Sequence, residues 1–392
     1  MRHLAFFRAA STEVEGSSEY RGLLAGLVVL RLIDKCRSSN RDPELQAREV
    51  LPVRQAVEAM ENGQMQRALR ELLDSTATLM QGRPDSCVEK LASYGRLLER
   101  DARWDPAADV HLTAIELGNE SRALLPRCYQ RAAICFRKMG QLSRVEELLR
   151  EGQRIATENG DEFWWLQIRL SVASLAIHKG ELSEAERVLD AILAAADASG
   201  STMVAAQVRQ GLGHAAYERK QYGRAVEYFH AAVQMHVDPS FKVPAILDLA
   251  LALAEMGYLD VARTVLSTTR HSPHLDVEFR NSTALNLMNF ATMARDRTQF
   301  ELLRRELANA RLNGAQLARY HIIVGQGCFA FDDLSAARRE FAEAVVTAQA
   351  HGEGVALTDA KQWLATSAVP ARMSTILDDL LTGIKQFGEA AD

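Results

Sequence analysis

Three small residues have the spacing of a glycine motif that could hold a phosphate. Gly325, Gly327 and Ala330 match the fingerprint that binds the pyrophosphate of a dinucleotide. That fingerprint works between a strand and the start of a helix, where backbone amides face the phosphates. Here the residues fall in the middle of a predicted helix, so we interpret the glycines as packing residues. No phosphate loop, His-Glu-x-x-His or Gly-x-Ser-x-Gly occurs. We therefore expect no catalytic residue, no cofactor and no enzymatic activity.

Residue types that bind metals are scattered along the chain. None of the five cysteines forms a Cys-x-x-Cys pair, and their number is odd, which argues against a zinc knuckle or a disulfide framework. His178 and His214 fall on predicted groove positions, one in each of two neighbouring repeats, and could bind a metal or sense pH. A lone histidine that makes one hydrogen bond is more common. We expect no metal site and reduced, buried thiols.

A series of basic and amide side chains offers a different chemistry, the binding of a peptide. The series consists of Arg96, Arg100, Arg127, Arg131, Arg137, Lys138, Gln167, His178, Gln207, Gln210, His214, Asn286 and Asn289. Arginines pair with carboxylates, and amides can pair with a peptide backbone. We expect these residues to line a groove that takes an extended peptide with an acidic portion. The alternative is a solvated face whose arginines pair with local glutamates, because surface ion pairs contribute little.

The elements that would position this series come from an internal repeat. A turn residue is followed by an apolar residue, a small residue and, four positions later, a bulky one. The small-residue position recurs every 37 to 40 residues, at Ala68, Ala107, Val145, Ala185, Ala225, Ala262, Phe300 and Ala337. Phe300 makes the seventh copy the weakest. Each copy predicts two antiparallel helices, the first ended by a left-handed residue such as Gly63, Gly140, Gly180 or Gly257.

The copy at residues 207–239 resembles the tetratricopeptide family. Its matching residues are Leu212, Gly213, Tyr217, Tyr222, Ala225, Phe229, Ala232 and Pro239. The step is longer than the 34 residues of that family and is similar to the long repeats of bacterial signal-sensing regulators. The resemblance implies an interaction scaffold with a concave groove. Asn286 and Asn289 are similar to the asparagines with which peptide-sensing members hold a ligand backbone.

Composition agrees with such a scaffold. Hydrophobic residues make up 47% of the 392 residues and charged residues 25%, with a formal net charge of −5. Nucleic-acid binding generally needs a basic surface, so we expect none. The longest apolar stretch, Gly22 to Ile33, is shorter than the roughly twenty residues that cross a membrane. We expect a cytoplasmic protein that does not contact membranes.

The sequence predicts an all-α, right-handed α-solenoid of about eight helical hairpins with N- and C-terminal capping helices. Residues 1–45 would form an N-terminal helical cap or dimerisation segment, 46–352 the solenoid, and 353–392 the C-terminal capping helices, near 355–367 and 373–387. The helix expected at Tyr20 to Ser38 is apolar nearly all round and must be buried. It could pack on the first repeat or make a homodimer.

Two functions fit this architecture. The first is a scaffold or adaptor in bacterial signalling or regulation that binds a protein or peptide in its groove. The second is a regulator that senses a ligand or peptide and acts on transcription or on a partner enzyme. Residues 1–45 are too apolar and too poor in basic residues for a helix-turn-helix domain, so such a regulator would act by contacting another protein.

Overall fold

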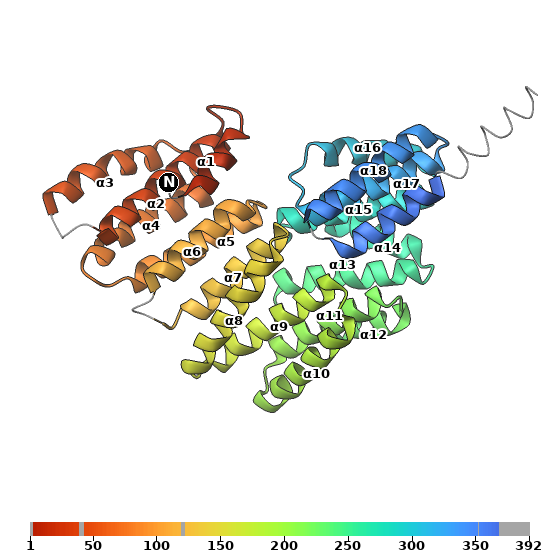
Figure 1. The fold of residues 1–392 in the computed structure, drawn as a ribbon, viewed down its shortest axis with the longest axis horizontal. Coiled ribbons are helices and arrows are strands. Elements are labelled where there is room, and N and C mark those ends of the chain that lie inside the picture. Colours follow the sequence, from red (N-terminus) through yellow and green to blue (C-terminus); the bar gives the residue numbers. More distant parts are fainter. Residues whose placement is uncertain (1–2, 39–42, 119–121, 352, 368–392) are drawn as a thin grey trace, which may run out of the picture.

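The fold is an arc of helical hairpins. The computed structural model describes residues 3–38, 43–118, 122–351 and 353–367, and no strand occurs among them. The hairpins are α3 (Pro43–Glu58) with α4 (Gln64–Met80), α5 (Asp85–Arg100) with α6 (Trp104–Leu117), α7 (Leu125–Lys138) with α8 (Leu142–Glu158), α9 (Glu162–Lys179) with α10 (Leu182–Ser199), α11 (Thr202–Glu218) with α12 (Tyr222–Met235), α13 (Pro239–Glu255) with α14 (Leu259–Thr269), α15 (Val277–Met293) with α16 (Arg297–Ala308), and α17 (Gly314–Ala330) with α18 (Leu334–His351). These are the eight predicted repeats (Figure 1). None of the helices in the described part could cross a membrane.

A left-handed residue marks the turn inside seven of the eight hairpins. These residues are Ala102, Gly140, Gly180, Lys220, Gly257, Arg295 and Asp332, and they follow the same step of 37 to 40 residues. Three predicted glycines are among them. The prediction for Gly63 is wrong, because its φ of −164° is extended and it caps the start of α4 instead.

Small residues on the first helix of a hairpin receive bulky residues from the second. A Cβ atom added at Gly213 would lie 2.5 Å from the Phe229 ring, and one at Gly325 equally close to Phe341. Phe300, the misfit of the seventh repeat, packs against Gly327 of the next repeat. Both glycines of the dinucleotide-like motif are therefore packing residues inside α17, as predicted.

Two further elements precede the solenoid. α1 (Leu4–Ser11) was not predicted as a helix, whereas α2 (Ser18–Ser38) was. Leu23, Leu30 and Ile33 of α2 are fully buried in the first apolar core together with residues of α4 and α5. This packing covers most of the apolar surface of α2 within the chain. The predicted boundary after residue 45 falls in the first turn of α3.

At the other end, a helix at residues 354–367 follows α18, as predicted. Ala360 is completely buried, and Trp363 stacks on Phe341 with ring centroids 5.6 Å apart. The helix therefore packs back onto the last repeat. The second capping helix, expected at 373–387, lies outside the described residues.

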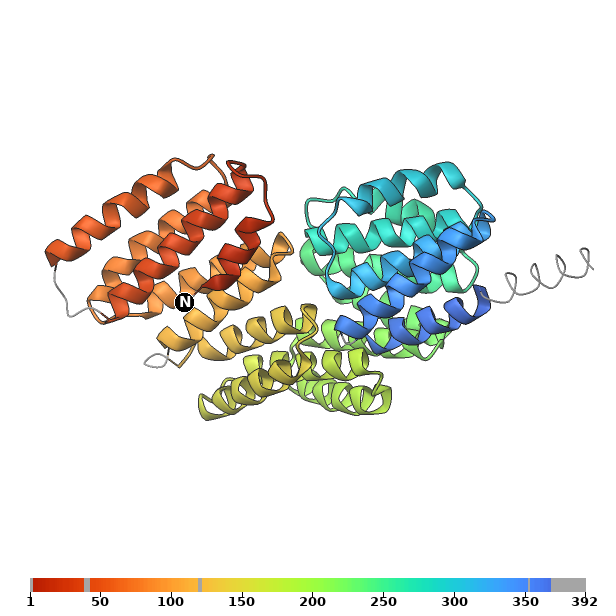
Figure 2. The same cartoon turned by 45° about the horizontal axis from the view of Figure 1, so that its top comes forward.

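The arc bends so far that its two arms meet. Figures 1 and 2 show α1 to α6 in one arm, α15 to α18 in the other, and α7 to α13 joining them. Glu13, which follows α1, accepts hydrogen bonds from Arg103 at 3.0 Å and from Arg311 of the opposite arm at 2.6 Å. Residues 298 positions apart are thus in direct contact.

Three other contacts complete this junction, which we call the seam. Lys138 at the end of α7 forms an ion pair with Glu278 at the start of α15. His178 Nδ1 lies 3.6 Å from the Glu353 carboxylate. Gly140 touches the backbone of His351 closely enough that a Cβ atom would clash. None of the apolar clusters among the described residues crosses the seam, so its contacts are polar.

Candidate ligand-binding cavity

The inner side of the arc encloses a cavity of about 850 Å³. One wall is formed by the first helices of three successive repeats, α7, α9 and α11. The opposite wall is formed by α17, by Asn289 of α15 and by the helix at 354–367. Closure of the seam brings these walls together. The cavity lies in the size range of ligand pockets.

Nine of the thirteen predicted groove residues line this cavity. They are Arg131, Arg137, Lys138, Gln167, His178, Gln207, Gln210, His214 and Asn289. The other four do not line it. Arg96, Arg100 and Arg127 lie outside the cavity, on or toward the N-terminal arm, and Asn286 lies just behind the wall, where its Oδ1 accepts a 2.7 Å hydrogen bond from Arg319.

Three glutamines form a row across the wall. Gln130, Gln167 and Gln207 come from α7, α9 and α11, one from each repeat. Gln130 Nε2 donates to the backbone oxygen of Gln167 at 2.9 Å, and Gln167 Nε2 donates to Gln207 Oε1 at 2.7 Å. Each bond links neighbouring repeats. Because the row lines the cavity, it also presents fixed amide groups to a ligand.

Arg131 reaches the cavity from a buried ion network. Glu99, which is almost fully buried, accepts a 3.0 Å hydrogen bond from Arg131 Nε and a 2.6 Å bond from Arg96. His111 Nε2 lies 2.7 Å from the same carboxylate. Burial, with help from the positive charge of Arg96, lowers the pKa of His111 to about 3. The imidazole is then neutral and donates to Glu99.

Cys135 joins Glu99 and His111 in a group whose possible ligand atoms lie within 4.8 Å of one another. A sulfur, a nitrogen and an oxygen ligand resemble a zinc set. Two guanidinium groups already balance the charge of Glu99. A divalent cation would add charge beside both arginines, so this chemistry favours a structural ion network over a metal centre.

The seam end of the cavity is cationic. Arg137 and Lys138 project from the end of α7, and Lys138 also lies 5.9 Å from the centre of the Trp104 ring. Burial lowers the pKa of Arg137. Burial also raises the pKa of Glu353 to about 7, although Lys138 and Arg137 pull it down. The Glu353 carboxyl group is therefore partly protonated near neutral pH.

The other end of the same wall is more acidic. His214 and Gln210 of α11 both contact Asp248 of α13, at 3.2 and 2.6 Å. Glu218, near the end of α11, lines the cavity opposite Asp359 of the helix at 354–367. Burial raises the pKa of Glu218, although His214 and Arg319 pull it down, and the negative charge of Asp359 adds to the rise. The cavity thus has a cationic end and an anionic end.

Much of the second wall was not predicted from the sequence. Arg319, Gln326, Glu353 and Asp359 line the cavity but were not among the expected binding residues. Gln130 was missed as well, although it stands 37 positions before Gln167, a step that fits the repeat. That spacing could have identified it. Glu353 and Asp359 carried no such signal, because they belong to the segment that follows the last repeat.

No protein-family model matches the sequence, and no curated protein matches it. Solved structures do resemble the fold. The structure of NprR in complex with its cognate peptide NprX is 14% identical in sequence, with a TM-score of 0.54. The match covers 81% of this chain and 97% of the NprR chain. The Rap conjugation gene regulator of plasmid pLS20, in complex with the Phr* peptide, is 10% identical in sequence, with a TM-score of 0.53. The match covers 83% of this chain and 97% of that regulator. The apo form of the quorum sensor NprR from B. thuringiensis is 13% identical in sequence, with a TM-score of 0.50. The match covers 82% of this chain and 97% of that chain.

At these identities the likeness concerns the fold. The chain is a right-handed α-solenoid of tetratricopeptide-like hairpins, as its repeat predicts. The likeness extends over nearly the full length of each of the three solved chains.

Proposed function

We propose that this protein is a scaffold of bacterial signalling or regulation that binds an extended peptide in the cavity on the inner side of its arc. The observation that carries the proposal is the cavity wall, where amide groups from three successive repeats stand in a row beside a cationic end. Amides recognise a peptide backbone, and guanidinium groups recognise carboxylates. The ligand would therefore be a peptide with an acidic portion.

The expected length of the peptide follows from helix spacing. Packed helices lie about 8–10 Å apart, so α7 and α11, two steps apart, are separated by roughly 16–20 Å. An extended chain covers about 3.3–3.6 Å per residue. The wall would thus accommodate about five or six residues. Two of the solved structures that share this fold hold a peptide, NprX in one and Phr* in the other, which supports the same class of ligand.

We also propose roles for the segments at the two ends. Residues 1–45 would cap the solenoid, because α1 and α2 pack on the first repeats, with Phe6 stacked 6.3 Å from Tyr94. Residues 46–352 would form the binding solenoid. The segment 353–392 would do more than cap it, because the helix at 354–367 supplies one wall of the cavity. Binding rather than turnover would be the activity, and the protein would reside in the cytoplasm.

Affinity selection tests this proposal. The full chain is mixed with a pool of random hexapeptides, bound peptides are recovered by gel filtration and identified by mass spectrometry, and affinities are measured by calorimetry. We expect recovered peptides to be enriched in Asp and Glu. Gln207→Ala and Asn289→Ala should each weaken binding about tenfold, as for the loss of one or two hydrogen bonds.

The matched control is Gln153→Ala, which removes an amide from α8, away from the cavity. Its affinity should equal that of the unchanged protein. If no peptide is retained, or if both cavity variants bind as well as the control, the proposed function is wrong.

A further inference from the structure

One cation of the cavity has no direct ion pair among the described residues. Arg131 is paired with Glu99, Lys138 with Glu278, and Arg319 with the side-chain oxygen of Asn286. Among the described residues, Arg137 has neither an ion pair nor a side-chain hydrogen bond, yet it is half-buried and lines the cavity. A desolvated guanidinium is costly to leave unpaired. Glu278 and Glu353 act on the charge of Arg137 only from beyond ion-pair distance, so the guanidinium is open to a direct pair with a ligand anion.

The position of Arg137 limits what that anion can belong to. Arg137 immediately precedes Lys138, which pairs with Glu278 of the opposite arm. It lies three residues before Gly140, which contacts the backbone of His351 in the same arm. The cavity wall is thus joined to the opposite arm at this point. A peptide that runs across α11, α9 and α7 would meet the opposite arm at the seam and could not continue in the same direction. An end of the peptide, rather than an interior residue, fits here.

We infer that the seam end of the cavity is a receptor for the terminal carboxylate of the peptide, and that Arg137 is the residue that pairs with it. This inference rests on the proposed function. A guanidinium can bind a carboxylate through two parallel hydrogen bonds. The ligand is then a short peptide with a free carboxyl end, oriented with that end at α7.

Glu353 provides the second argument for an anion at this place. Its carboxyl group is close enough to Lys138 and Arg137 to feel their charge, but no contact within ion-pair distance links it to Arg137. Burial raises its pKa to about 7. Near neutral pH, Glu353 can therefore take up a proton when a ligand carboxylate binds, and the ligand then supplies the negative charge beside Lys138 and Arg137 with little electrostatic repulsion.

The orientation also assigns the amino end of the peptide. Glu218 and Asp359 face each other across the far end of the cavity. Neither forms an ion pair among the described residues, and His214 and Arg319 act on Glu218 only from farther away. With the carboxyl end at Arg137, a peptide of about five or six extended residues brings its amino group to this pair. Each end of the ligand then meets the opposite charge.

The test compares one hexapeptide, recovered from the random pool, in three forms: the free acid, the C-terminal carboxamide and the N-acetylated acid. Affinities for the full chain are measured by calorimetry at pH 7. We expect the carboxamide to bind at least tenfold more weakly than the acid. In Arg137→Gln the acid and the carboxamide should bind equally, whereas Arg137→Lys should keep part of the preference.

Arg150→Gln is the matched control, because Arg150 is exposed on α8 and lines no part of the cavity; it should keep the full preference for the acid. Equal binding of acid and carboxamide by the unchanged protein would overturn the carboxylate receptor while leaving peptide binding intact. A preference for the acid that persists in Arg137→Gln would overturn the role of Arg137. Failure of every peptide to bind would instead overturn the proposed function itself.

Discussion

Glu99 links the packing of the repeats to the cavity. Its carboxylate is buried and is shared by Arg96, Arg131 and a neutral His111. In the repeat, His111 stands where Leu189 and Phe229 stand in later copies, and Gly95 makes room for its ring. The second repeat therefore uses a polar residue at an apolar position. Its effect is to hold Arg131 at the edge of the cavity.

Glu353 gives a pH-dependent prediction at this scale. When ionised, Glu353 repels a ligand carboxylate, and its pKa of about 7 means that it gains a proton between pH 8 and pH 6. The neighbouring His178, with a pKa lowered to about 4 mainly by burial, stays neutral over this range. Affinity for an acidic hexapeptide should therefore rise several-fold as the pH falls from 8 to 6.

Calorimetry of Glu353→Gln at both pH values checks this expectation. The variant should bind more tightly than the unchanged protein at pH 8 and should lose most of the pH dependence. His214 and Glu218, farther along the cavity on α11, would supply what remains. An unchanged pH profile in Glu353→Gln would show that another group controls it.

Individual residues were harder to place from the sequence than the helices that carry them. The repeat assigned Arg131, Gln167 and Gln207 to the inner face because that assignment needs only the local helical period. Arg96 and Arg100 lie on the corresponding face of α5 but miss the cavity. The superhelix curves, so the inner faces of distant repeats do not share one space. This curvature is the sum of many small crossing angles, and no residue pattern reports it.

At the scale of the element, the turn inside each hairpin repeats more faithfully than any residue type. The same left-handed backbone is adopted by three glycines and by Ala102, Lys220, Arg295 and Asp332. An L-residue pays roughly 1–2 kcal/mol for this conformation. The sequence predicted the turn where glycine occupies it. In the other hairpins the packing of the two helices imposes the same conformation on residues other than glycine. The positions of glycines alone therefore predict only some of these turns.

Gly180 allows a clean test of this turn. Its φ is +79°, and a Cβ atom added there would meet no other atom within 4 Å. Gly180→Ala should therefore lower the free energy of unfolding by about 1 kcal/mol through backbone strain alone, as measured by urea denaturation. The expected result is a lower urea midpoint for the loss of helical circular dichroism.

Gly223 is the matched control. It lies in the first turn of α12 with a helical backbone, and it too has open space around its Cα. Gly223→Ala should raise stability by about 0.5–1 kcal/mol, since alanine favours a helix over glycine. Equal effects of the two substitutions would argue against strain at the turn.

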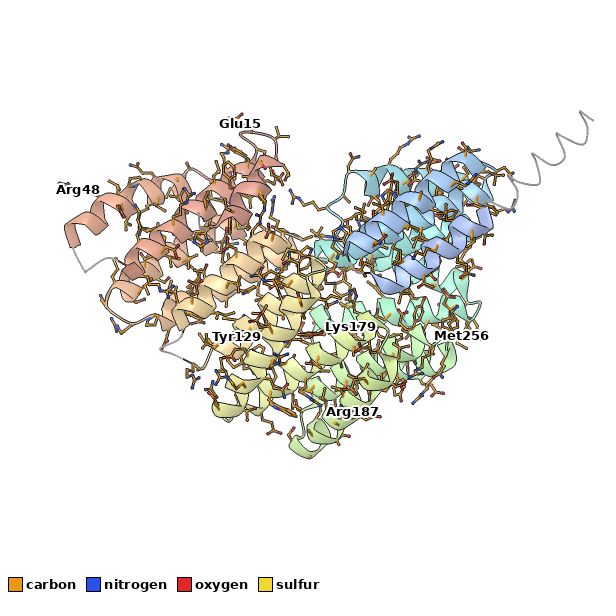
Figure 3. All side chains as sticks on the ribbon, in the orientation of Figure 1. Glu15, Arg48, Tyr129, Lys179, Arg187 and Met256 are labelled. Carbon is orange, nitrogen blue, oxygen red and sulfur yellow. The ribbon has the colours of Figure 1, made fainter. Side chains whose placement is uncertain are left out.

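At the scale of the whole molecule, the arc contains two kinds of interface. Neighbouring repeats share apolar cores, such as the cluster that joins α13 to α17. The seam has polar contacts, including that of Glu13 with Arg311. Charge interactions weaken with ionic strength, while apolar contacts do not. The seam is therefore the place where the arc can open, and Figure 3 shows side chains of both arms approaching each other there.

Small-angle X-ray scattering tests this difference. Raising NaCl from about 0.1 to 1 M shortens the Debye length from about 10 to 3 Å, and we expect the radius of gyration to increase as the arms part. Glu13→Gln should already be expanded at low salt. Arg187→Gln, which removes an ion pair within α10, should behave like the unchanged protein. A radius that is independent of both salt and Glu13 would contradict a polar seam.

The number and order of the hairpins could be predicted from the sequence, because each hairpin needs a small residue and a bulky residue a few positions apart, and this pair recurs at a regular spacing. It did not predict the seam. Glu13 and Arg311 lie in connecting segments, and nothing in their surroundings indicates a partner 298 residues away. The cavity depends on that contact, so its second wall could not be derived from the repeat.

The distance along the chain between Glu13 and Arg311 also has a consequence for the order of folding. Each hairpin can form from local contacts, which are fast and cost little loop-closure entropy. The seam can form only after α17 has joined the stack. During synthesis, which proceeds from the N-terminus at about 5–20 residues per second, the emerging arc would stay open for many seconds. Under the proposed function, a peptide would be captured only after this last step, so the capacity to bind would arise at the end of folding rather than gradually.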